Sequence, residues 1–358
     1  MLDFTSALYL GLRHGSAALG RWDALSLGRP AALASPPGAE VLAEQIAHVQ
    51  GLEAAVLLPS TLHLFQDVFA LLGGSDTRVL VDSCAYPIAR WGAAQVPGGI
   101  TAFAHHNSSA LAEAAYNCAR RGARPLVLCD GYCPGCGRIA PLRQYADIAR
   151  RYEGHLVLDD TQALGILGMT SADAAAYGRG GGGALRWCAT RAPHIVVGAS
   201  LAKAFGAPLA VLAGSPGLIA RFRNHSETLV HCSPPTIVVI RAARCALAIN
   251  ARYGDGLRRR LSSLVERLRS WALIAGLRPV GPLPFPMQSF HALGRNGPVA
   301  LHERLLRQGV RTVVTRACDQ LTTRLTFLVT ARHRFSEVDA AGRLLAQTAW
   351  PTLAYARV

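Results

Sequence analysis

Short apolar runs alternate with longer amphipathic segments along the first two-thirds of the chain. The runs are rich in Val, Leu and Ala, and they predict strands at 54–59, 78–82, 125–130, 155–160, 194–199 and 209–214. Between two of them, residues 141–154 begin at a proline and end at a glycine, as an amphipathic helix does. This alternation predicts an α/β domain built on a mostly parallel sheet, in which ligands lie at the carboxyl ends of the strands.

The pattern changes after Pro234 and Pro235. A long helical region at 236–275 is followed by a helix at 298–308 and a strand at 324–330, which predicts a smaller α+β domain. We therefore divide the chain into an N-terminal arm (1–37), a large domain (38–235), and a linker helix with a small C-terminal domain (236–358).

Composition and charge limit the compartment and the partners that we expect for this protein. No run of 18 apolar residues and no basic region before an apolar start occurs, so we expect neither a membrane span nor a signal peptide. Nine scattered cysteines favour reduced thiols in the cytoplasm. The net charge of +15 comes from arginines spread along the chain, and the one dense run, 258–260, lies in a helical stretch, so we expect no nucleic-acid partner.

Two motifs have competing interpretations. Cys133 and Cys136 have the spacing of metal ligands, but a structural zinc site needs four, and no second pair follows at a suitable distance. We expect no metal site, and two interpretations of these cysteines stay open, a redox pair or two small buried residues.

The glycine run at 178–183 fits a dinucleotide motif only by its glycines, because no strand precedes it. We interpret it as a mobile loop.

One lysine stands out. Of the 37 lysine and arginine residues only Lys203 is a lysine, and it lies in an apolar, glycine-punctuated segment after a predicted strand. Burial lowers the pKa of a lysine and makes its amine nucleophilic, whereas arginine never deprotonates in proteins. The preceding strand ends in Asp159, a costly position for an acid without a cationic partner. Together they indicate Schiff-base chemistry on pyridoxal 5′-phosphate, with the acid at the pyridine nitrogen.

Several motifs in order along the chain resemble the α-oxoamine synthase family of fold-type I pyridoxal-phosphate enzymes. They are 9-YLGL-12, 129-CDGYCPGCGRIAPL-142, 158-LDDTQALGILG-168, 198-GASLAKAFG-206 and 322-TTRLTFLVTARHRFSEVD-339. The resemblance implies an aspartate-aminotransferase-like fold with a mostly parallel seven-stranded sheet in the large domain. It also implies a homodimer, with the segment beginning at His231 near the partner's phosphate site.

The resemblance also implies roles for individual residues. Lys203 holds the cofactor and later moves the substrate's α-proton, and Asp159 pairs with the ring nitrogen. Gln162 stands where the family has a histidine at the ring's phenolic oxygen, and Tyr86 where it has a stacked histidine. The phosphate is assigned to Ser200 and to the helix start at Ser60, Thr61 and Leu62.

The substrate half departs from the family pattern. At the positions where the family grips the substrate carboxylate with an arginine and an asparagine, this chain has Thr326 and Ala7. Arg324, on the same face of the strand, and Arg316 are candidate replacements. The implied reaction joins an acyl thioester, on CoA or a carrier protein, to an amino acid with loss of CO₂. The alternatives are an aminotransferase, a retro-aldol or elimination enzyme, and a non-catalytic relic of the fold.

Overall fold

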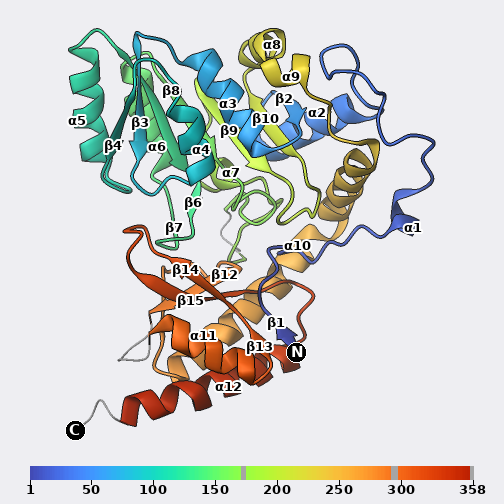
Figure 1. Cartoon of the computed structure of the whole chain (residues 1–358), viewed down its shortest axis with the longest axis vertical. Helices are drawn as coiled ribbons and strands as arrows, with labels where there is room; N and C mark the ends of the chain where they lie inside the picture. The colour runs from blue at the N-terminus through green and yellow to red at the C-terminus, as the bar shows by residue number, and fades with distance from the viewer. Residues whose placement is uncertain (171–174, 292–296, 355–358) are drawn as a thin grey trace.

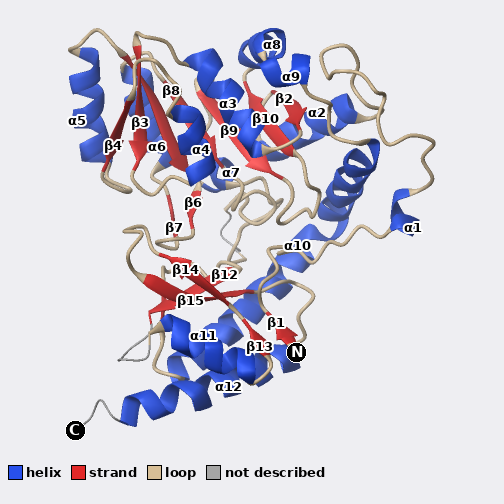
Figure 2. Cartoon of the chain, viewed as in Figure 1, coloured by secondary structure: helices blue, strands red, loops and turns tan. Residues whose placement is uncertain are grey.

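A seven-stranded sheet forms the centre of the larger part of the molecule (Figures 1 and 2). The computed structural model describes residues 1–170, 175–291 and 297–354. In spatial order the strands are β2 (Ala54–Leu58), β10 (Ala210–Gly214), β9 (Ile195–Ser200), β8 (His155–Asp159), β5 (Arg124–Asp130), β3 (Thr77–Asp82) and β4 (Ile100–Phe103). Only β10 runs antiparallel to its neighbours in this sheet.

Helices cover both faces of this sheet. In β5, Leu126 and Leu128 pack into one layer, while Val127 and Cys129 pack into the other, because successive side chains of a strand point to opposite faces. The first layer contains α3 (Thr61–Leu72), α4 (Pro87–Ala93), α8 (Pro216–His225) and α9 (Glu227–His231). The second contains α2 (Ala39–Gln50), α5 (Ser108–Ala119), α6 (Leu142–Arg151) and α7 (Ala184–Trp187). Burial on both faces explains why the strands are continuous apolar runs.

A second, antiparallel sheet lies in the C-terminal part, in the order β11 (Arg278–Pro279), β12 (Met287–His291), β15 (Thr323–Leu328) and β14 (Val313–Arg316). It packs with α11 (Pro298–Arg307), while α12 (Phe335–Ala354) packs against α11 and α10 (Ile237–Ile274). Helix α10 runs between the two parts (Figure 1). The chain start joins this part, because β1 (Leu2–Asp3) pairs with β13 (Val310–Arg311). The remaining elements are α1 (Ser16–Leu19), β6 (Tyr132–Cys133) and β7 (Arg138–Ile139).

The predicted architecture, a mostly parallel seven-stranded sheet with a smaller α+β unit, is confirmed. All six predicted strands are present, and β4 was missed. It is a short edge strand in which only Phe103 is buried, so it has no apolar run to detect. In the part of the chain that the structure describes, no helix is long and apolar enough to cross a membrane.

The glycine run at 178–183 is irregular, as expected of a loop, but it is closely packed. A Cβ on Gly183, which has a φ of +91°, would lie 1.8 Å from the carboxylate of Asp160. Arg258, which is 1% exposed, fixes the neighbouring backbone by donating to the carbonyl of Gly165 at 2.8 Å, and it pairs with Asp255 at 2.7 Å. Glycine is needed here because the backbone approaches other groups too closely for a side chain.

Candidate active site

A cavity of about 180 Å³ lies where β5, β8 and β9 end at their carboxyl edges. Parallel strands end at one edge of the sheet, and this edge is where α/β folds bind ligands. The lining residues are Thr61, Tyr86, Ile88, Asp130, Tyr132, Pro134, Asp159, Thr161, Gln162, Ser200, Ala202 and Lys203. The structure therefore brings six of the predicted site residues to one cavity.

Lys203 follows β9 and is half-buried. Burial lowers the pKa of its amine, while the negative charges of Asp159 and Asp130 act in the opposite direction. Within the described residues the amine makes no hydrogen bond and no ion pair. An amine in this state is available as a nucleophile.

Asp159 ends β8 and is 7% exposed. Burial raises the pKa of its carboxyl group, and hydrogen bonds from Thr161 and the charge of Lys203 oppose this shift. The backbone N–H of Thr161 donates to Asp159 Oδ1 at 3.0 Å. The hydroxyl of Thr161 in turn accepts from the backbone N–H of Ser200 at 3.0 Å, so it ties the two strand ends together.

Gln162 is oriented by a residue from the start of the chain. The hydroxyl of Tyr9, which is fully buried, donates to Oε1 of Gln162 at 2.8 Å. With its oxygen engaged, the amide of Gln162 keeps its N–H groups for a ligand in the cavity. The motif around Tyr9 was recognised in the sequence, but this contact was not, because the two residues are 153 positions apart.

Asp130 is a lining residue that the sequence analysis missed. It ends β5 and is the register partner of Asp159 on the neighbouring strand. Its Oδ1 accepts from the backbone N–H of Tyr86 at 3.1 Å, and burial together with the charge of Asp159 raises its pKa well above the usual value. The signal was available, since an acid at the end of an apolar strand is the same pattern that identified Asp159.

The predicted phosphate-binding residues divide into two groups. Thr61, at the start of α3, and Ser200 line the cavity. Ser60 caps α3 by accepting from the backbone N–H of His63 at 3.5 Å. Leu62 is 45% exposed and is not among the lining residues.

His231 also lies outside the lining set. It is exposed at the end of α9, where it pairs with Glu227 at 3.1 Å.

The arginines proposed for the substrate carboxylate also differ in placement. Arg324 is half-buried and donates through Nη1 to the carbonyl of Gly135, next to the cavity residue Pro134, while its Nε is buried without a hydrogen-bond partner. Arg316 is exposed and donates to the carbonyl of Gln320 at 3.2 Å. Thus only Arg324 lies beside the cavity.

Thr326 stands at the family's arginine position and is fully buried. Its Oγ1 lies 2.8 Å from that of Ser289 and 2.7 Å from that of Thr315, on the two neighbouring strands. The hydroxyl groups satisfy one another. Thr326 therefore cannot take the place of an arginine at a carboxylate.

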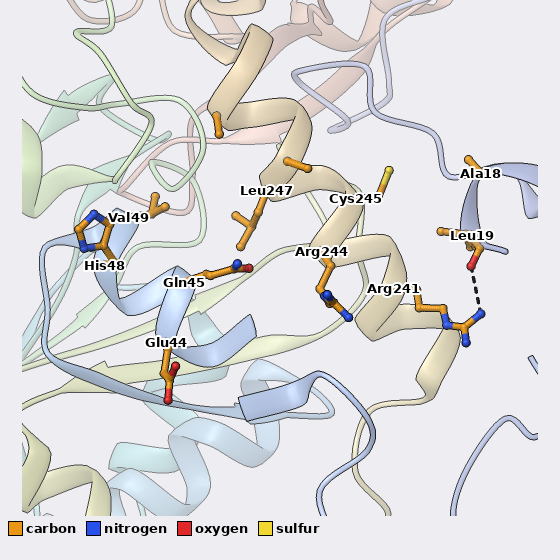
Figure 3. A pocket seen from close by; sticks show the side chains of 12 residues that line it. Ala18, Leu19, Glu44, Gln45, His48, Val49, Arg241, Arg244, Cys245 and Leu247 are labelled. Carbon is orange, nitrogen blue, oxygen red and sulfur yellow. Dashed lines mark hydrogen bonds between the residues drawn. The ribbon is translucent and has the colours of Figure 1, made fainter. Parts of the chain in front are cut away.

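A larger hollow of about 790 Å³ lies between α1, α2 and α10 (Figure 3). Arg241 and Arg244 line it on the side of α10, and Glu44 and His48 on the side of α2. Arg241 donates to the carbonyl of Leu19 at 3.2 Å. This larger hollow shares no lining residue with the cavity at Lys203, and none of its lining residues lies at the end of a strand. We therefore place the chemistry at the smaller cavity.

The chain is similar to known proteins over most of its length. The family described as "Aminotransferase class I and II" matches residues 17–339. The chain is 29% identical to 8-amino-7-oxononanoate synthase of Acidithiobacillus ferrooxidans over 279 residues, covering 75% of this chain and 68% of that protein. With the same enzyme of Thioalkalivibrio sulfidiphilus the identity is 30%, with 75% and 66% covered.

Solved structures show the same fold. A serine palmitoyltransferase of Sphingomonas wittichii superposes with a TM-score of 0.85 at 16% identity, covering 98% of this chain and 88% of that one. The 8-amino-7-oxononanoate synthase of Francisella tularensis gives a TM-score of 0.80 at 15% identity, covering 100% and 99%.

Proposed function

Because this chain belongs to the aminotransferase class I and II family, we propose that it joins an acyl thioester to an amino acid and releases CO₂ and a thiol. The cofactor predicted from the motifs, pyridoxal 5′-phosphate, and the α-oxoamine synthase-like enzyme class are confirmed at the level of the family. One observation carries the proposal. The chain's single lysine has an unpartnered amine in a cavity that also holds a buried aspartate.

The residues present fit the cofactor. Asp159 supplies a carboxylate for the ring nitrogen, and Gln162, with its oxygen held by Tyr9, supplies an N–H for the ring's phenolic oxygen. Thr61 and Ser200 are the hydroxyl groups available for the phosphate, beside the N-terminus of α3. When bound, the cofactor acts as an electron sink for a carbanion at the substrate's α-carbon.

Lys203 has two tasks in this proposal. Burial lowers the pKa of its amine, which favours the neutral form; this amine would hold the cofactor, and it would take and return a proton at the substrate's α-carbon. The new bond joins the α-carbon to the acyl carbon and the thiolate leaves. The substrate's carboxyl group departs as CO₂, and its place is taken by a proton.

Arg324 is the residue that we propose to bind the substrate carboxylate. It stands two residues from the family position on the same face of β15, and its buried Nε has no partner among the described residues. A buried donor without a partner costs about 1–3 kcal/mol, which a carboxylate at this position would recover. Arg316 is the second candidate, on β14, where its side chain is exposed and is not among the residues that line the cavity.

The test is a decarboxylation assay. The purified enzyme is given a panel of amino acids labelled at C1 together with acyl-CoA or acyl-carrier thioesters, and labelled CO₂ and free thiol are measured. We expect both products in equal amounts with one amino acid class. Transfer of the amino group to a keto acid, with no CO₂ released, would overturn the proposed reaction.

An aminotransferase or a retro-aldol or elimination enzyme is the second candidate. The observation that favours it is Thr326, whose hydroxyl group is committed to Ser289 and Thr315 at the position of the family's arginine. An altered carboxylate site leaves room for a different bond to be broken at the same cofactor.

We also propose that the protein is a homodimer in the cytoplasm. Near the cavity, Leu62, Tyr86 and Trp91 are 45%, 52% and 59% exposed, an apolar surface that a second copy would cover. All nine cysteines are free thiols, which suits a reducing compartment. Sedimentation of the purified protein gives the oligomeric state directly.

A further inference from the structure

Four side chains with soft or borderline ligand atoms converge beside the cavity. Cys84 follows β3, His105 follows β4, Cys133 is in β6, and Cys318 lies between β14 and β15. Their sulfur and imidazole nitrogen atoms all lie within 4.8 Å of one another. We propose that these four residues bind one zinc ion in a closed, structural site.

The separations suit a single tetrahedral ion. With Zn–S bonds of about 2.3 Å, two sulfur ligands on a tetrahedron lie about 3.8 Å apart. Cys133 Sγ and Cys318 Sγ are 3.5 Å apart, far beyond the S–S bond of about 2.0 Å in a disulfide. Three thiolates and one imidazole form a ligand set that zinc takes in structural sites.

Asp82 provides the outer support that a metal-bound histidine needs. Its Oδ1 lies 2.6 Å from His105 Nδ1, which leaves Nε2 to face the sulfur atoms. The same carboxylate accepts from the backbone N–H of Cys84 at 2.9 Å and from that of His106 at 3.1 Å. It is 2% exposed, so it fixes both ligand segments from inside the protein. Carboxylate, histidine and metal in this order orient the imidazole and raise its basicity.

Cys136 is the neighbouring thiol in the Cys-x-x-Cys motif. Its Sγ lies 3.1 Å from His105 Nε2 and 3.9 Å from His106 Nδ1. Its thiol also interacts with those of Cys133 and Cys318, but its sulfur is not among the four ligand atoms that all lie within 4.8 Å of one another. We therefore assign it to the rim of the site and not to the four ligands.

The location gives the ion a role. Cys133 lies between Tyr132 and Pro134, which line the cavity at Lys203, and Cys84 is two residues before Tyr86, which lines it too. Cys318 belongs to the C-terminal part, and it packs so close to Gly135 that a Cβ there would lie 2.9 Å from its sulfur. With all four positions taken by protein, the ion joins the cavity wall to the C-terminal sheet and performs no chemistry itself.

The first experiment is metal analysis of the full-length protein, purified without chelator or histidine tag after growth in zinc-supplemented medium. We expect one zinc per chain, and less than about a tenth of that in Cys133→Ser and in Cys318→Ser. The matched control is Cys245→Ser, which removes a half-buried thiol on α10 outside the cluster and keeps the zinc.

A second measurement covers the case in which the variants do not fold. The wild-type protein is stripped and refilled with Co²⁺, and the visible spectrum is expected to show the intense bands of tetrahedral cobalt with thiolate-to-metal charge transfer. Wild-type protein that holds no zinc and shows no such bands, one that holds iron instead, or a disulfide between Cys133 and Cys318 on non-reducing peptide mapping would overturn the proposal. Pyridoxal phosphate is quantified separately, so loss of cofactor without loss of zinc counts only against the proposed function.

Discussion

Asp159 and Asp160 are adjacent buried acids that lie in different surroundings, one at the cavity and one inside the protein. Asp159 lines the cavity, whereas Asp160, at 1% exposure, turns away and accepts from the backbone N–H of Ala184 at 3.1 and 3.2 Å. Asp159→Asn, which removes a charge, and Asp160→Ala, which removes an acceptor, separate cofactor binding from stability. The fold tolerates Asp159→Asn, because Oδ1 of asparagine still accepts from the backbone N–H of Thr161.

The size of the effect follows from the bond that is lost. A hydrogen bond to a charged group contributes about 1.5–3 kcal/mol and a neutral one about 1 kcal/mol, so removing the charge at Asp159 costs about 0.5–2 kcal/mol. Since 1.4 kcal/mol is a factor of ten, Asp159→Asn should bind pyridoxal phosphate about 2- to 30-fold more weakly. Screening by solvent does not reduce this value much, because the carboxyl group is 7% exposed.

The assay is titration of the apoprotein with pyridoxal phosphate, followed by tryptophan fluorescence, alongside thermal unfolding. We expect Asp159→Asn to lose affinity and keep its melting temperature. Asp160→Ala leaves the backbone N–H of Ala184 without its acceptor, so we expect it to keep affinity and lose melting temperature. Equal affinity for Asp159→Asn and wild type, or a loss of affinity confined to Asp160→Ala, would refute the assignment.

Three further predictions follow from single contacts. Burial lowers the pKa of Lys203 below its usual 10.5, so the folded apoprotein binds fewer protons than the unfolded chain and its stability rises with pH up to about 10.5. The rise of the free energy of unfolding with pH, measured by urea unfolding, should be smaller in Lys203→Met. An unchanged rise in that variant would contradict the lowered pKa. Tyr9→Phe removes the hydroxyl that donates to Gln162, and it should weaken cofactor binding by about 1 kcal/mol without changing the fold. Titration measures the affinity and circular dichroism the fold. An unaltered affinity would mean that the amide of Gln162 is oriented without the hydrogen bond from Tyr9. Arg258→Met leaves the Gly165 carbonyl unpaired inside the protein and should lower the free energy of unfolding by about 1–3 kcal/mol, whereas the exposed Arg259→Met serves as control and should not. Equal unfolding midpoints for these two variants would contradict the buried role of Arg258.

The apolar runs were sufficient to predict six of the seven strands, because strands covered on both faces are apolar throughout. The same logic placed Asp159 and Lys203 at strand ends, and it would have placed Asp130 had it been applied to β5. Arg324 donates to the carbonyl of Gly135 beside the cavity, whereas no local pattern indicated that Arg316 would be exposed and donate to the carbonyl of Gln320. A side chain's direction at the end of a strand depends on its turn, which local pattern does not encode.

By itself the sequence determined which residues are candidates for the chemistry, since a single lysine among 37 basic side chains and an acid at the end of an apolar strand can be recognised without a fold. Tertiary structure decided which of them meet. Tyr9 reaches Gln162 across 153 residues, and Cys133 meets Cys318 across 185. We expected no metal site because no second pair of ligands lies near Cys133 and Cys136 in the sequence. The proposed ligands come from four separate segments, which only the sheet order and the packing of the C-terminal part bring together. Spacing along a chain reports a site only when one element supplies its ligands, because contacts between elements are fixed by packing.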